Sequence, residues 1–169
     1  VCSSDLLDNS DKVLNHRPAA GSWSALECME HLNRYGNFYL PEIQRRIAQS
    51  PHPASAQFKS GWLGNYFAKS LLPKEKLNKM KTFSNMDPMG SDLGREVLHT
   101  FIAQQEQTLS LLKEAKNVDL SKTKTAISIS SWIKLRLGDT FRVLIYHNQR
   151  HVLQAERALG LAEVAKMHV

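Results

Sequence analysis

The sequence predicts an all-α protein: a four-helix bundle with long crossover connections, whose first helix is truncated. Three segments, residues 25–49, 91–117 and 139–160, repeat apolar side chains at helical spacing. A shorter helical pattern over residues 5–15 is typical of the tail of a clipped helix. Helices with one apolar stripe must bury it against one another, and a bundle satisfies all of them at once.

Length and composition favour a single domain. The chain has 169 residues, of which 42% are hydrophobic, enough to form a substantial core. We expect one domain over residues 7–160 and a C-terminal tail over 161–169. Residues 1–6 lack an initiator Met and resemble the translation of a common sequencing adapter, so we expect a non-native leader there.

The charge balance excludes little. Lys and Arg number 22 against 16 Asp and Glu, and this excess is spread along the chain. It permits an anionic partner without requiring one, and a nucleic-acid binder would need one contiguous positive face. We therefore expect no nucleic-acid partner. Two cysteines cannot build a disulfide framework, and no apolar run reaches the ~20 residues of a membrane span, so we expect a cytoplasmic protein without membrane contact.

The clearest helix start is at Ser24. Ser24 and Glu27 match a capping box, in which each side chain satisfies a free backbone N–H of the other residue. The helix should run to about Gln49, with a kink at Pro41. Before it, Pro18 ends the clipped helix, because the residue preceding a proline is disfavoured in the α region.

The remaining segments connect and complete the bundle. The pattern over residues 61–72 predicts a short helix that acts as a lid or brace over the bundle. Its aromatic residues Trp62, Tyr66 and Phe67 could line a pocket, but packing in the core is the favoured role. Residues 118–136 alternate apolar and polar side chains, which predicts an extended strap. The last helix should begin at an N-cap formed by Asp139 or Thr140 and end at Gly160.

Two histidines in the last helix suggest half of a metal site. His147 and His151 lie four residues apart, so both imidazoles point from one helix face and can share a cation. The ordinary alternative is a solvated or acid-bonded pair. Asn148 follows the first histidine, so the stretch lacks the built-in base of an H-E-x-x-H motif. His31 is the best candidate for a third ligand, although a lone helical histidine is more often a core residue.

The pattern W-S-x-x-E-x-x-x-H-L from Trp23 to Leu32, together with H-x-x-x-H-x-x-Q from His147 to Gln154, resembles the DinB-like superfamily of metal-binding four-helix bundles. The resemblance implies a metal triad of His31, His147 and His151. It also implies either a metal-dependent hydrolase or a transferase that uses a low-molecular-weight thiol, acting on a small-molecule substrate, and it allows a homodimer.

Zinc and nickel are the expected metals, since both suit imidazole ligands. Glu27 and Gln154 each lie one turn from a candidate ligand and are candidates to orient it by a hydrogen bond. Capping is the favoured role of Glu27. No individual catalytic residue is identified. The alternative function is a non-catalytic bundle that holds a metal or a small ligand.

Overall fold

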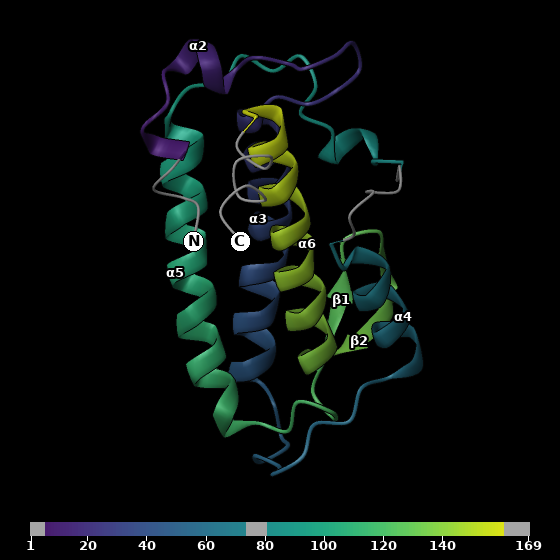
Figure 1. Cartoon of the computed structure of the whole chain (residues 1–169). Helices are drawn as coiled ribbons and strands as arrows, with labels where there is room; N and C mark the ends of the chain where they lie inside the picture. Colours follow the sequence, from purple (N-terminus) through teal and green to yellow (C-terminus); the bar gives the residue numbers. More distant parts are fainter. Residues whose placement is uncertain (1–5, 74–80, 161–169) are drawn as a thin grey trace, which may run out of the picture. The chain divides into compact units, whose positions relative to one another are not determined.

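The computed structural model describes residues 6–73 and 81–160, and these are mostly helical (Figure 1). The predicted all-α class is confirmed, with a small two-stranded sheet in addition. In chain order the elements are α2 (Asp11–Leu14), α3 (Ala25–Ala48), α4 (Trp62–Leu71), the 3-10 turn η1 (Ser84–Met86), α5 (Glu96–Glu114), the 3-10 turn η2 (Ala115–Asn117), β1 (Lys124–Ile127), β2 (Ser130–Arg136) and α6 (Leu137–Ala158).

The chain divides into two compact units. Unit 1 comprises residues 1–34, 73–103 and 148–169, and unit 2 comprises residues 35–72 and 104–147, so α3, α5 and α6 each contribute to both. Each unit has its own buried apolar cluster. The expectation of one domain over residues 7–160 stays a prediction. The predicted tail and all of the predicted leader except Leu6 lie outside the described residues, and Leu6 is buried in the unit 1 cluster.

The capping box starts α3 as the sequence predicts. Ser24 Oγ accepts a hydrogen bond from the Glu27 backbone N–H at 3.2 Å, and Glu27 Oε2 accepts one from the Ser24 N–H at 2.9 Å. The helix continues to Ala48 with Pro41 inside it. The predicted kink at this proline stays a prediction.

Two helix starts differ from the prediction in unit 1. The continuous helix expected over residues 5–15 is wrong, because Ser10 adopts an extended conformation and caps a separate four-residue helix, α2, by accepting from the Val13 N–H. The start expected near Ser91 is also wrong. α5 begins at Glu96, whose side chain accepts a hydrogen bond from the Gly94 N–H at 3.0 Å and so fixes the preceding turn.

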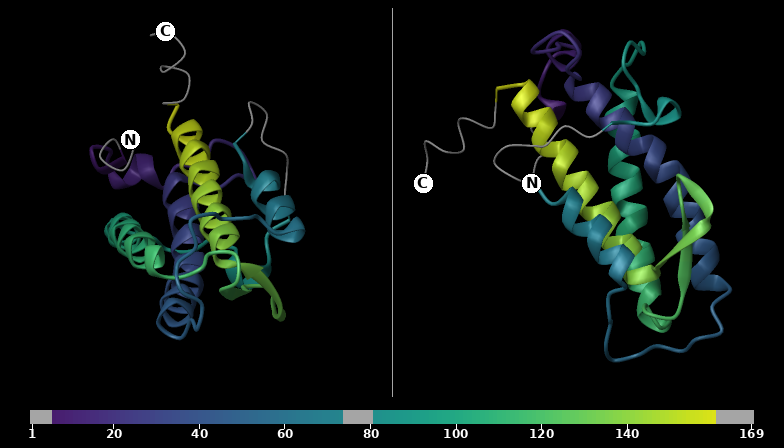
Figure 2. Two further views of the ribbon diagram at one scale, coloured as in Figure 1. Left: turned by 90° about the horizontal axis from the view of Figure 1, so that it is seen from below. Right: turned by 90° about the vertical axis from the view of Figure 1, so that its right-hand side faces the viewer.

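In unit 2 the predicted strap is extended, and it folds into an antiparallel hairpin (Figure 2). Lys124 pairs with Arg136 and Ala126 with Lys134, and a bulge follows Ala126. The hairpin is tied to α3 at Glu42, whose carboxylate accepts from the Ala126 N–H at 2.9 Å. β2 leads directly into α6 without an intervening loop.

The predicted N-cap of α6 is wrong. The helix begins at Leu137, which places Asp139 inside its first turn, fully buried. Its carboxylate instead accepts hydrogen bonds from the Ser60 hydroxyl and, at 2.7 Å, from the Gly61 N–H at the start of α4. Gly64 permits this approach, since a Cβ there would lie 2.4 Å from atoms of the Asp139 side chain.

The predicted core packing of the α4 aromatics is also wrong for two residues. Trp62 is 85% exposed and Tyr66 62% exposed, and both line a shallow surface hollow with Asn65, Lys69 and Ser70. α4 packs through its small residues instead, with Gly64 and Ala68 buried. None of the described helices combines the length and the apolar composition needed to cross a membrane.

Candidate metal centre

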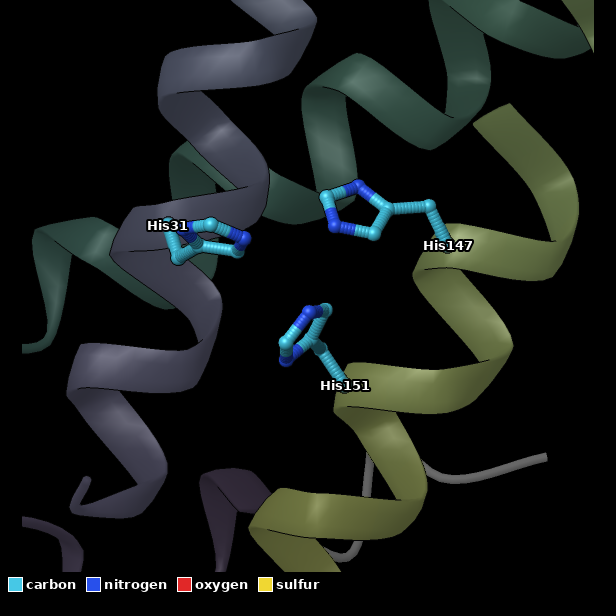
Figure 3. Close-up of side chains that lie close together, drawn as sticks. All are labelled: His31, His147 and His151. Carbon is cyan, nitrogen blue, oxygen red and sulfur yellow. The ribbon is translucent and has the colours of Figure 1, made fainter. Parts of the chain in front are cut away.

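Three buried histidines from α3 and α6 lie together. His31 comes from α3, and His147 and His151 come from consecutive turns of α6; their rings point toward one another (Figure 3). The potential ligand atoms of the three all lie within 4.8 Å of one another, and the residues are 3%, 8% and 8% exposed. The structure thus brings together the three residues that the sequence suggested as ligands.

Local sequence explains the direction of each ring. The four-residue spacing of His147 and His151 stacks them on one face of α6. The capping box fixes where α3 begins. His31 follows one turn after Glu27, and its neighbours Cys28 and Leu32 are buried in the unit 1 cluster. The start and the period of each helix therefore determine which helix face carries its histidines.

His31 is held in one protonation state. Its Nδ1 lies 2.7 Å from the carbonyl oxygen of Met86. A carbonyl oxygen only accepts, so Nδ1 carries the proton and the lone pair remains on Nε2. Burial lowers the pKa of His31 to about 4, and the bond to Met86 offsets only part of this effect. At neutral pH the imidazole of His31 is therefore uncharged, as metal binding requires.

His151 is oriented in a similar way by its own helix. Its Nδ1 lies 3.0 Å from the side-chain oxygen of Gln154, three residues further along α6. With the amide oxygen as acceptor, Nδ1–H donates and Nε2 is left for coordination. Gln154 therefore occupies the place at which the sequence suggested a supporting residue.

Aromatic rings surround the histidines. In unit 1 the Trp23 ring lies against His31, with centroids 4.6 Å apart, and against His151 at 5.6 Å. The His31 and His151 rings are themselves 4.6 Å apart. In unit 2 Tyr35 meets His147 edge to face at 4.6 Å. These contacts restrict the rings and reduce the reorganisation needed to bind an ion.

Glu27 is engaged in other interactions. Its oxygens form an ion pair with Arg17 and accept from the backbone N–H groups of Ser24 and Gly90. Burial alone would raise the pKa of this carboxyl group, but the Arg17 guanidinium and the two N–H groups outweigh burial and leave the pKa below its usual range. The carboxylate is only 2% exposed. Its contacts are those of a structural anchor.

His99, on α5, and Cys28, on α3, are not part of this cluster. His99 is exposed on α5. Cys28 is fully buried, and burial raises the pKa of its thiol far above the usual range, which keeps it protonated and unreactive. Among the described residues, the group of potential metal ligands contains His31, His147 and His151.

Sequence reasoning did not identify the groups that hold the histidine rings in place. Met86, Asp87 and Trp23 contact the histidines or one another, and no sequence pattern assigned Met86 or Asp87 to the site. No local signal identifies which distant carbonyl will accept from a given imidazole. A buried indole N–H usually has a partner, but nothing in the sequence identifies Asp87 as the partner of Trp23.

The donor set suits a divalent metal ion. Three imidazoles, of which His31 is uncharged at neutral pH and two have Nδ1–H held by an acceptor, match the arrangement found around Zn²⁺ and related ions in proteins. Met86 and Gln154 each keep Nδ1 of their histidine protonated, which makes Nε2 of His31 and of His151 the nitrogen suited to metal binding.

One of three comparisons with known proteins finds a match. The model of the DinB superfamily matches residues 5–155, most of the chain. No match is found among curated proteins or among solved structures. The family match and the three-histidine cluster together fit a metal-binding protein.

Proposed function

Because the chain belongs to the DinB superfamily, we propose that it is a divalent-metal-dependent enzyme, either a hydrolase or a transferase that uses a low-molecular-weight thiol. The observation that carries the proposal is the buried cluster of His31, His147 and His151. Their three imidazoles are the proposed ligands, and Zn²⁺ and Ni²⁺ are the proposed ions.

The protein residues have defined tasks in this proposal. His31 and His151 present Nε2 to the ion because Met86 and Gln154 hold the opposite nitrogen. When bound, such an ion supplies Lewis-acid chemistry: it polarises a substrate oxygen and activates water or a thiol. Three protein ligands would leave a coordination position open for water or substrate, as in catalytic rather than structural sites. The proposed substrate is a small molecule.

A reducing location is consistent with thiol chemistry. Cys28 is a free, buried cysteine. We place the protein in the cytoplasm on that ground, as part of the same proposal.

A second candidate is a bundle that holds a metal or small ligand without turnover. The engagement of Glu27 favours it, since this carboxylate, one turn from His31, is already bound by Arg17, Ser24 and Gly90. A hydrolase that needs a carboxylate base would have to find it elsewhere.

The test begins with metal analysis of purified wild type, His147→Ala and His151→Ala. His99→Ala is the matched control, because it removes an exposed imidazole from another helix. We expect about one divalent ion per chain in wild type and control, and at least a tenfold loss of affinity in the two variants. Equal, negligible metal in all four proteins would contradict the proposal.

Turnover separates the two candidates. Metal-loaded wild type and His99→Ala are screened with low-molecular-weight thiols plus electrophiles, and with hydrolysable esters and amides. The enzyme proposal expects a reaction that both proteins catalyse and that His147→Ala lacks. Stoichiometric metal without turnover on either set would favour the binding protein.

A further inference from the structure

Two consecutive residues in unit 1 connect to both histidines of that unit. The Met86 carbonyl accepts from His31 Nδ1 at 2.7 Å, and Asp87 Oδ1 lies 3.2 Å from the indole nitrogen of Trp23, which donates to it. The same indole ring lies against His31 and His151. One short segment thus contacts one histidine directly and both histidines through a tryptophan.

Asp87 is fixed by its own neighbours. Its Oδ1 also accepts from the Met89 N–H at 3.0 Å, and its backbone carbonyl accepts from Arg34 Nη1 at 2.8 Å. Arg34 is anchored in turn by Glu30, one turn earlier on α3. These contacts hold the Asp87 carboxylate in place independently of its hydrogen bond to the indole N–H.

Trp23 is equally constrained. It directly precedes the capping residue Ser24, is 9% exposed and belongs to the unit 1 apolar cluster. Its ring is tilted 47° to His31 and 36° to His151. A buried indole whose N–H is bonded has one favoured orientation, and this orientation limits both imidazoles.

We infer that Trp23 and Asp87 are positioning residues for the metal ligands His31 and His151. This inference rests on the proposed metal function and extends it to residues outside the triad. The indole restricts the rotation of two imidazoles, and Asp87 restricts the indole. Groups that orient ligands in this way typically raise metal affinity about 10–100-fold.

The test measures Co²⁺ affinity and the visible spectrum of bound Co²⁺ in purified, metal-free protein. The background is Trp62→Phe/Trp132→Phe, because these two tryptophans are 85% and 92% exposed and their replacement leaves Trp23 as the sole indole. In this background, Trp23 fluorescence quenched by bound Co²⁺ provides a second readout that needs no activity.

Four variants separate orientation from simple loss of packing. Asp87→Ala removes the acceptor for the indole N–H, whereas Asp87→Asn keeps an oxygen that can accept it. Trp23→Leu removes the ring, and Trp23→Phe keeps a ring without the N–H. Trp62→Leu in the wild-type chain is the control for losing an exposed tryptophan that belongs to unit 2. Unfolding of each metal-free protein is measured in parallel.

We expect Asp87→Ala and Trp23→Leu to weaken Co²⁺ binding about tenfold or more and to change the Co²⁺ spectrum. Asp87→Asn should restore both toward wild type, Trp23→Phe should be intermediate, and Trp62→Leu should change neither. If Trp23→Leu does not fold, the comparison of Asp87→Ala with Asp87→Asn tests the positioning role alone.

Two negative results have different meanings. If wild type binds Co²⁺ but Asp87→Ala matches it in affinity and spectrum, the positioning role is wrong while the metal site stands. If wild type binds no Co²⁺, the proposed function fails and the inference fails with it.

Discussion

At the scale of single residues, the helical period accounts for the site better than any one side chain does. The spacing of His147 and His151 predicts a shared face, and a capping box fixes the start of the helix that carries His31. The acceptor for His31, by contrast, is Met86, 55 residues away in the sequence. A backbone carbonyl has no side-chain signature, so the sequence could suggest the three histidines as a group but not this acceptor.

Glu27 should make stability depend on pH. Its pKa is depressed in the folded protein, so its contribution to stability is present above the unfolded value of about 4.3 and is lost as pH falls through the lower folded value. We expect Glu27→Ala to destabilise the protein at pH 7 by about 2 kcal/mol, from the loss of a cap and a charged hydrogen bond.

Urea unfolding at pH 7 and at several acidic values measures this effect. The difference in unfolding free energy between wild type and Glu27→Ala should shrink on acidification. A difference that stays constant from pH 7 down to pH 3 would show that the carboxylate charge is unimportant. Glu106→Ala, which removes a carboxyl group from α5, is the control.

Gln154 should affect metal affinity without affecting the fold. Its side-chain oxygen holds Nδ1–H of His151, and removing such an acceptor weakens metal binding by about tenfold or more. Competition with a chromophoric chelator should show this loss in Gln154→Leu and a recovery in Gln154→Glu, which keeps an acceptor oxygen. Equal affinities in all three proteins would assign Gln154 no supporting role.

At the scale of elements, the errors of sequence reasoning have a common cause. Asp is a residue type favoured at the N-cap, yet the Asp139 carboxylate accepts from the Gly61 N–H at the start of α4 rather than capping its own helix. Trp62 and Tyr66 have the spacing of a core stripe, yet α4 packs through Gly64 and Ala68. In each case a partner distant in sequence determines the role, and local propensity does not contain that information. The extended strap was predictable because alternation is a local pattern.

Asp139→Ala should destabilise α4 in particular. The variant leaves the Gly61 N–H and the Arg142 guanidinium without this carboxylate. We expect a loss of about 2–3 kcal/mol, since the bonds are charge-assisted and Asp139 is fully buried. Hydrogen exchange should accelerate in α4 more than in the second half of α5.

Gly64→Ala tests the same contact from the other side. The added Cβ would lie 2.4 Å from the Asp139 Cβ, which cannot swing away, so we expect a cost of about 1–3 kcal/mol. Tyr66→Ala, at an exposed position in the same helix, should cost little. Equal thermal unfolding of Gly64→Ala and wild type would contradict the close packing of α4 on Asp139.

At the scale of the whole molecule, the all-α class and the three long helices follow from apolar periodicity, and membership of the DinB superfamily agrees with both. If an ion binds only the folded chain, it must also stabilise the fold. An ion at 100 times its dissociation constant adds about 2.7 kcal/mol to the free energy of unfolding. Chelation should therefore lower the melting temperature of wild type and leave that of His151→Ala unchanged.

X-ray absorption at the edge of the bound metal tests the central claim most directly, because it identifies the ligands themselves. For the zinc-loaded protein we predict a shell of light atoms at about 2.0–2.1 Å, with outer-shell scattering from three imidazoles that falls to two in His31→Ala. A sulfur shell at about 2.3 Å, or an imidazole count that His31→Ala leaves unchanged, would contradict the three-histidine site.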